Sequence, residues 1–150
     1  MCYKIAVQIY GHLRTFEQCA PALKKHLLDK YDCDVFIHTW SMTNHADSSW
    51  YPDEARSKSV RLENSVLAQL NSLYLPKDCL IEEQKLFNEE GKFGTHDTIC
   101  ISLNGMKYMT YSQHMASQLR EKYAAKHHIN YDYVVTIRPK RDRIYHGAGA

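Results

Sequence analysis

The chain has 150 residues, of which 44% are hydrophobic and 24% are charged, so its composition predicts one globular domain and excludes extensive disorder. The net charge is +2, and basic residues cluster only at 140–143, which argues against a nucleic-acid-binding protein. No apolar run approaches the ~20 residues of a membrane span, and no signal peptide is recognisable. We therefore expect a cytoplasmic protein, with peripheral contact to a membrane left open.

The cysteines favour the same compartment. They are five in number, widely spaced and without a C-x-x-C pair, which disfavours both a disulfide framework and a structural zinc site. The five are Cys2, Cys19, Cys33, Cys79 and Cys100. We expect reduced thiols.

The first half of the chain alternates between strand and helix patterns. A short β-rich run covers residues 3–9, and apolar residues at helical spacing follow over residues 16–31, where Pro21 is tolerable in a first turn. Residues 33–40 form a second apolar strand. Residues 41–61 are polar and rich in Asn, Asp and Ser, which is typical of a long loop or lid.

The second half continues this alternation. An amphipathic helix is predicted over residues 62–74, a short strand over 79–83 and an exposed connection over 84–97. The longest helix runs from about residue 102 to 127, and a terminal strand covers 131–137. One side of the long helix carries Met106, Met109, Gln113, Ala116, Leu119, Arg120 and Tyr123. Its methionines are typical of core filling.

Four strands alternating with three helices predict an α/β fold. We expect a mostly parallel, Rossmann-like sheet with right-handed crossovers and flanking helices. Residues 1–142 would form a single domain, and residues 143–150 a short disordered tail. The ligand edge would lie at the carboxyl ends of the strands, where three segments converge: the turn at residues 10–15, the strand end at 38–40, and Arg138 onward.

The turn after the first strand is a candidate phosphate site. Gly11 could let the backbone approach a phosphate, and Arg14 could form charge-assisted hydrogen bonds to it. The turn has neither the P-loop pattern nor the G-x-G-x-x-G fingerprint, so a simple turn with a solvated arginine is the alternative.

The second strand contributes His38 and Trp40. Asp34 shares a strand face with His38, but the two lie about 13 Å apart along an extended strand and cannot chelate one metal directly. His38 is predicted to be a hydrogen-bonded core or rim histidine. Trp40 could be a core residue or a stacking surface for a base or sugar. The sequence supports no Ser/His/Asp or Cys/His nucleophilic arrangement.

Three ordered motifs carry a resemblance to a known family. They are residues 11–16 (GHLRTF), 31–40 (YDCDVFIHTW) and 131–139 (YDYVVTIRP). Over roughly residues 3–139 the chain resembles glycosyltransferase-like proteins of bacterial surface-polysaccharide synthesis and of some large viruses. The resemblance implies the nucleotide-binding half of a GT-A-like fold. It also implies a nucleotide-sugar donor and a glycan acceptor as partners.

The resemblance also implies a set of binding residues. It places Gly11, Arg14 and Arg138 at the nucleotide sugar. From their own positions we add Trp40 as a stacking surface and Lys140 as a cation at the diphosphate, with Asp142 as a candidate metal ligand. In the family, an aspartate that binds Mn or Mg usually follows the Arg-Pro pair directly, whereas Lys140 stands at that position here. Two strand residues displace a side chain by about 6.6 Å. Asp142 could therefore bind a metal only if the intervening residues bulge out. The alternative is that Lys140 or Arg141 neutralises the diphosphate directly.

The sequence thus predicts nucleotide-sugar binding and glycosyl transfer in polysaccharide or glycan synthesis. The eight residues after Asp142 are too few for an acceptor-binding half, so we expect a truncated transferase, or one completed by a partner chain or a homodimer. Catalytic competence and the catalytic residues stay open. The alternative is a non-catalytic α/β domain that binds a carbohydrate, a nucleotide or a protein.

Overall fold

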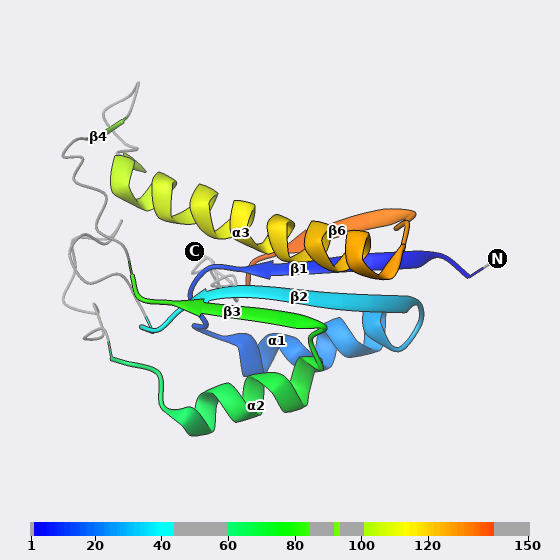
Figure 1. Cartoon of the computed structure of the whole chain (residues 1–150). Coiled ribbons are helices and arrows are strands. Elements are labelled where there is room, and N and C mark those ends of the chain that lie inside the picture. Colours follow the sequence, from blue (N-terminus) through cyan, green and yellow to red (C-terminus); the bar gives the residue numbers. More distant parts are fainter. Residues whose placement is uncertain (1, 44–59, 85–91, 94–100, 140–150) are drawn as a thin grey trace, which may run out of the picture.

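A parallel sheet of four strands forms the centre of the fold (Figure 1). The computed structural model describes residues 2–43, 60–84, 92–93 and 101–139. The strands, in sheet order, are β3 (Asp78–Glu82), β2 (Asp32–Trp40), β1 (Lys4–Tyr10) and β6 (Tyr133–Ile137). Their predicted boundaries were correct to within two residues. Residues 44–59 of the predicted polar loop 41–61, and the tail 143–150, lie outside the described residues.

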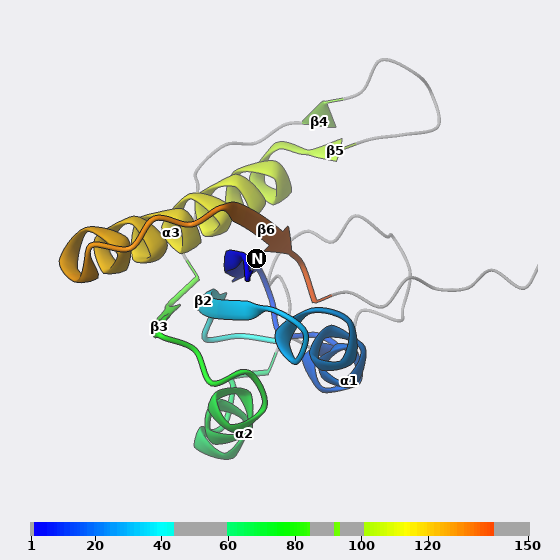
Figure 2. The ribbon, with the colours of Figure 1, turned by 90° about the vertical axis from the view of Figure 1, so that its right-hand side faces the viewer.

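Helices cover both faces of this sheet (Figure 2). One face carries α1 (Phe16–Leu23), the π-helical turn η1 (Lys24–Leu28) and α2 (Asn64–Tyr74), and the opposite face carries α3 (Leu103–His127). The short strands β4 (Lys92–Phe93) and β5 (Ile101–Ser102) form a separate antiparallel pair before α3. The predicted mostly parallel, Rossmann-like α/β fold is therefore confirmed. Within the described ranges, no helix combines the length and the apolarity needed to cross a membrane.

The order of the strands determines where a ligand crevice can open. From β1 the chain steps outward to β2 and then to β3, and after α3 it returns to place β6 on the other side of β1. The direction of winding thus reverses between β1 and β6. In open α/β sheets ligands bind at such a switch point, outside the carboxyl ends of the strands.

Two hydrophobic cores enclose the central strands. Ile5, Val7 and Ile9 of β1 point toward α1 and α2, whereas Ala6 packs with Phe36 and Leu119 on the side of α3. Residues 5–9 and 34–40 are buried throughout, as expected for parallel strands covered on both faces.

Two details of the helices differ from the prediction. Pro21 lies in the second turn of α1, and η1 begins three residues later. Proline lacks the N–H that a regular helix uses, so the widened turn follows the point where the hydrogen-bond ladder is interrupted. In α3, Met106 and Gln113 are exposed although they were grouped with the inward side. Ala116 and Leu119 of the predicted side are buried, and so are Tyr108 and Ser112, which the prediction did not include.

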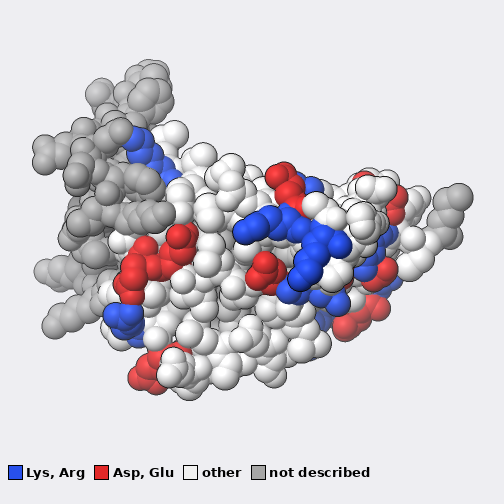
Figure 3. All heavy atoms as spheres, in the orientation of Figure 1, with Lys and Arg blue, Asp and Glu red and all other residues white. Residues whose placement is uncertain are grey.

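An ionic cluster fastens the amino ends of the strands. Lys4 Nζ lies 2.9 Å from Asp32 and 3.1 Å from the buried Asp34, which also accepts a hydrogen bond of 2.9 Å from Tyr131. Figure 3 shows Lys and Arg interspersed with Asp and Glu toward the end of the molecule where the strands begin. Partial burial alone would lower the pKa of Lys4, but hydrogen bonds and charge interactions with Asp32 and Asp34 outweigh it and raise this pKa above 10.5. Because the pKa of Lys4 is raised in the folded state, the interactions of its charged side chain stabilise the fold fully below pH 10.5. This contribution is lost only as the pH rises above that value.

The two carboxylates beside Lys4 give a matched test of burial. Asp34→Ala should lower the free energy of unfolding by about 2 kcal/mol, because it leaves the hydroxyl of Tyr131 without its acceptor in a buried site. Asp32→Ala should cost less than about 1 kcal/mol, because the side chain of Asp32 is 56% exposed. Urea denaturation at pH 7 measures both. Equal losses would contradict the dominance of burial.

Candidate functional site

The neighbouring carboxyl ends of β1 and β6 bring Gly11 and Arg138 together. Gly11 has a φ of +93°, a conformation that L side chains rarely adopt. A Cβ atom at Gly11 would lie 3.6 Å from Arg138 Nε, so the arginine side chain packs directly against the glycine. The turn after β1 and the residue after β6 thus form one continuous surface.

The turn between β1 and α1 is anchored from both sides. Gly11 N–H donates a 2.8 Å hydrogen bond to Ser112 Oγ of α3, and Thr15 Oγ1 donates one of 3.2 Å to the carbonyl of Pro139. The first bond ties the turn to the helix that crosses the sheet. The second ties it to the segment that leaves β6. The turn is therefore held in one geometry before any ligand arrives.

A small pocket opens beside this turn. Its volume is about 10 Å³, room for about one water molecule, and its lining comes from the turn, β2, α3 and the end of β6. The lining residues are Gly11, His12, Trp40, Tyr108, Met109 and Arg138. The structure thus brings together three of the residues predicted to bind a nucleotide sugar.

Of the other predicted site residues, the structure describes only Arg14. Arg14 belongs to the same turn, but it is exposed and absent from the lining. Lys140 and Asp142 lie outside the described residues. Among the residues that are described, no three His, Cys, Asp or Glu side chains are grouped so as to hold a metal ion.

Arg138 is the cation of the pocket. Its guanidinium is partly buried and donates from Nη1 to the thioether of Met109 at 3.6 Å. Within the described part of the chain, no carboxylate forms an ion pair with it. A thioether is a weak acceptor, whereas a guanidinium has five N–H donors that match a phosphate or carboxylate. Among the described residues, the thioether of Met109 is thus the one hydrogen-bond partner recorded for this guanidinium.

Trp40 forms the aromatic wall of the pocket. Its side chain is fully buried. One face stacks on Tyr111, with ring centroids 5.6 Å apart, and Tyr108 meets the indole edge-to-face at 5.8 Å. The ring is therefore a core residue that reaches the pocket from inside the protein, rather than an open platform on which a base could stack.

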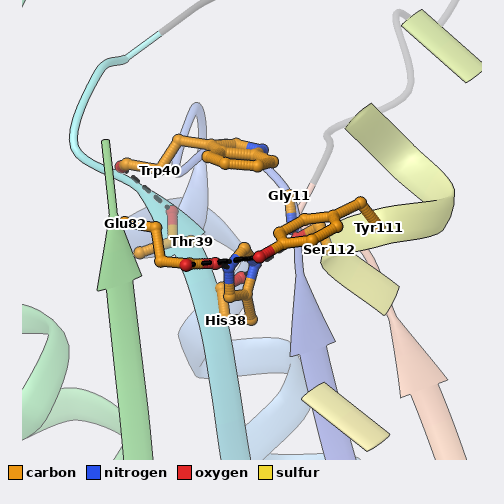
Figure 4. Close-up of polar contacts among 7 residues, drawn as sticks. All are labelled: Gly11, His38, Thr39, Trp40, Glu82, Tyr111 and Ser112. Atoms are coloured by element: carbon orange, nitrogen blue, oxygen red, sulfur yellow. Dashed lines mark hydrogen bonds and ion pairs between the residues drawn. The ribbon is translucent and has the colours of Figure 1, made fainter. Parts of the chain in front are cut away.

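A chain of hydrogen bonds runs beneath the pocket (Figure 4). His38 Nδ1 lies 2.7 Å from Ser112 Oγ, and His38 Nε2 lies 2.8 Å from Glu82 Oε2. Tyr111 Oη donates to the same carboxylate oxygen at 2.9 Å. Because His38 is fully buried, the prediction of a hydrogen-bonded core histidine is confirmed.

The order Ser112, His38, Glu82 is that of a nucleophilic triad, yet its surroundings do not fit that role. Ser112 is fully buried in the middle of α3, and its Oγ already accepts the Gly11 N–H. A nucleophile needs an open approach for the reacting carbon, and Ser112 is not among the residues that line the pocket. The arrangement is therefore suited to holding the backbone rather than to covalent chemistry.

The sequence interpretation missed Ser112, Tyr108 and Tyr111. The signal was present as the spacing of four, four and three residues between Tyr108, Ser112, Ala116 and Leu119, which places them on one face of a helix. A serine within this stripe breaks its apolar pattern, so the methionine positions dominated the prediction.

Comparison with known proteins adds no relative. No protein-family model, curated protein or solved structure matches the chain. A functional assignment therefore depends on the residues of the chain and their geometry.

The conformation of Gly11 can be tested by stability. Gly11→Ala should lower the free energy of unfolding by about 1–2 kcal/mol, because the new Cβ meets only ordinary contacts but the positive φ becomes strained. Leu75 provides the reverse change, since it has a φ of 46° and is exposed. Leu75→Gly should stabilise by about 0.5 kcal/mol. An unchanged free energy of unfolding for Gly11→Ala in urea denaturation would contradict this backbone strain.

Proposed function

We propose that the edge between β1 and β6 binds the diphosphate of a nucleotide sugar, and that the chain is a glycosyltransferase-like protein. The observation that carries this proposal is Arg138, a partly buried cation in the pocket at the switch point, for which the described residues supply a thioether and no carboxylate. Partly buried charges are normally balanced by a counter-charge. A bound diphosphate would supply one.

The neighbouring turn supports the same ligand class. Gly11 lets the backbone pass close to Arg138, and Arg14 lies three residues further along the same turn. Arginines at the carboxyl edge of a parallel sheet are typical of phosphate recognition. The motifs around residues 11–16, 31–40 and 131–139 favour a nucleotide sugar within that class, with a glycan as the acceptor.

Transfer requires more than donor binding. The acceptor-binding groups would come from outside the described residues or from a partner chain. If the chain binds a nucleotide sugar but neither transfers nor hydrolyses the sugar, it is the alternative, a non-catalytic binding domain. A donor labelled in the sugar separates these cases, because release or transfer of label reports catalysis directly.

The donor site is tested by calorimetry. A panel of UDP-glucose, UDP-N-acetylglucosamine, GDP-mannose and dTDP-glucose should contain a ligand whose affinity falls about tenfold to a hundredfold in Arg138→Ala, since charge-assisted hydrogen bonds are lost.

The matched control is Arg61→Ala. Arg61 is an exposed arginine that lies just before α2, and it already forms an ion pair with Glu83. Its removal should change affinity less than about twofold. The proposal fails if no member of the panel binds, or if the two variants bind equally well.

The charge that balances the diphosphate beyond Arg138 is a separate question. We propose that Lys140 serves in place of a metal ion, since Asp142 stands two residues beyond the position where the family has its metal ligand. Donor binding should then be unchanged by Mn²⁺ or EDTA. It should fall about tenfold in Lys140→Ala and stay unchanged in Asp142→Asn. Binding that requires Mn²⁺ and is lost in Asp142→Asn would show a metal site instead.

A further inference from the structure

Ser112 joins the proposed donor site to a hydrogen-bond chain on its far side. It is a fully buried hydroxyl in the middle of α3, and it lies between the Gly11 amide at 2.8 Å and His38 Nδ1 at 2.7 Å. Buried hydroxyls are kept in cores when their hydrogen bonds are made. Here one of those bonds holds the backbone of the turn against which Arg138 packs.

With a neutral His38 and an ionised Glu82, the donors and acceptors of this hydrogen-bond chain have one consistent order. The Gly11 N–H can only donate, so Ser112 Oγ accepts it. The hydroxyl proton then points to His38 Nδ1 at 2.7 Å rather than to the His38 carbonyl at 3.4 Å. With Nδ1 as acceptor, the neutral imidazole carries its proton on Nε2 and donates it to Glu82 at 2.8 Å.

We propose that Ser112, oriented by His38 and Glu82, is the positioning group of the diphosphate site. It holds Gly11 at its positive φ, so that the turn presents a preformed surface beside Arg138 instead of adopting this shape only when a ligand binds. The inference rests on the proposed donor-binding function. It adds that donor affinity depends on three residues that do not touch the ligand.

The reason is conformational. Glycine is the residue with the widest choice of backbone conformations, so an unanchored Gly11 turn would lose affinity to the entropy of ordering. The Ser112 hydroxyl removes that freedom in the free protein. His38 limits the hydroxyl to one rotamer, and Glu82 limits His38 to one tautomer. Each hydrogen bond of this series thus fixes the group that makes the next one, before a ligand binds.

The helix offers a matched control for the central variant. Ser112→Ala removes the acceptor of Gly11. Ser117→Ala removes another hydroxyl of α3, which accepts a 2.7 Å hydrogen bond from Gln8 Nε2 and donates one of 3.1 Å to the carbonyl of Gln113. In ¹⁵N-labelled protein, Ser112→Ala should raise the exchange rate of the Gly11 amide about three- to tenfold, and raise the Kd of the bound nucleotide sugar by a similar factor. Ser117→Ala should change either quantity less than twofold.

A second pair of variants tests the Glu82 end of the hydrogen-bond chain without a substitution at a fully buried residue. The side chain of Glu82 is partly exposed, so its substitution is compatible with folding. Glu82→Ala should shift the ¹⁵N resonances of His38 away from the Nε2–H tautomer and raise Kd about threefold. Glu82→Gln keeps an acceptor for Nε2–H and should restore both values.

The outcomes separate the two proposals. If the wild-type chain binds none of the four nucleotide sugars, the donor function fails and the positioning role fails with it. If the wild type binds and Ser112→Ala binds equally well, only the positioning role is overturned. If Ser112→Ala does not fold, the Glu82 pair decides, since an unchanged His38 tautomer and Kd in Glu82→Ala would overturn the positioning role.

Discussion

The return of α3 across the sheet is the constraint on which the site depends. Because this helix carries the chain from β3 at one edge to β6 beyond β1, the carboxyl ends of β1 and β6 become neighbours. Arg138 then lies against Gly11, and the same helix brings Ser112 beneath that glycine. If β6 had been added beyond β3 instead, the turn after β1 and Arg138 would lie at opposite edges of the sheet. The proximity of these residues is thus a consequence of topology.

The two ends of the sheet differ in how their charges are balanced. At the amino ends of the strands, Lys4 forms ion pairs with both Asp32 and Asp34, so these charges are balanced within the cluster. At the carboxyl ends, Glu82 is engaged by His38, whereas Arg138 is not paired with a described carboxylate. Oppositely charged side chains that are partly buried in a fold are normally paired with each other. The charges are thus balanced within the fold at the amino ends, and at the carboxyl ends Arg138 is the charge for which the proposed diphosphate would be the partner.

The sequence predicted the elements of this fold well because each follows from a local pattern. Apolar runs identified the strands, and the alternation of strand and helix implied the parallel sheet with Gly11 and Arg138 at its ligand edge. The burial of Ser112 and Tyr108 could not be predicted as easily. Which side of α3 faces the sheet depends on partners such as Gly11 and His38, which lie 101 and 74 residues away. The full burial of Trp40 also depends on rings from α3 that the strand pattern does not contain.

Burial decides what the Ser112, His38 and Glu82 arrangement can do. The same residue types in the same order generate a nucleophile when the hydroxyl faces a substrate. In this fold the hydroxyl faces a backbone amide, so the imidazole fixes the orientation of a hydrogen bond and activates nothing. Tyr108 and Met109 line the pocket one helical turn before Ser112, so a single rigid element forms the pocket wall and anchors the turn opposite it. A displacement of α3 would therefore change the shape of the pocket and the position of Gly11 together, which couples the geometry of the proposed site to the packing of one helix.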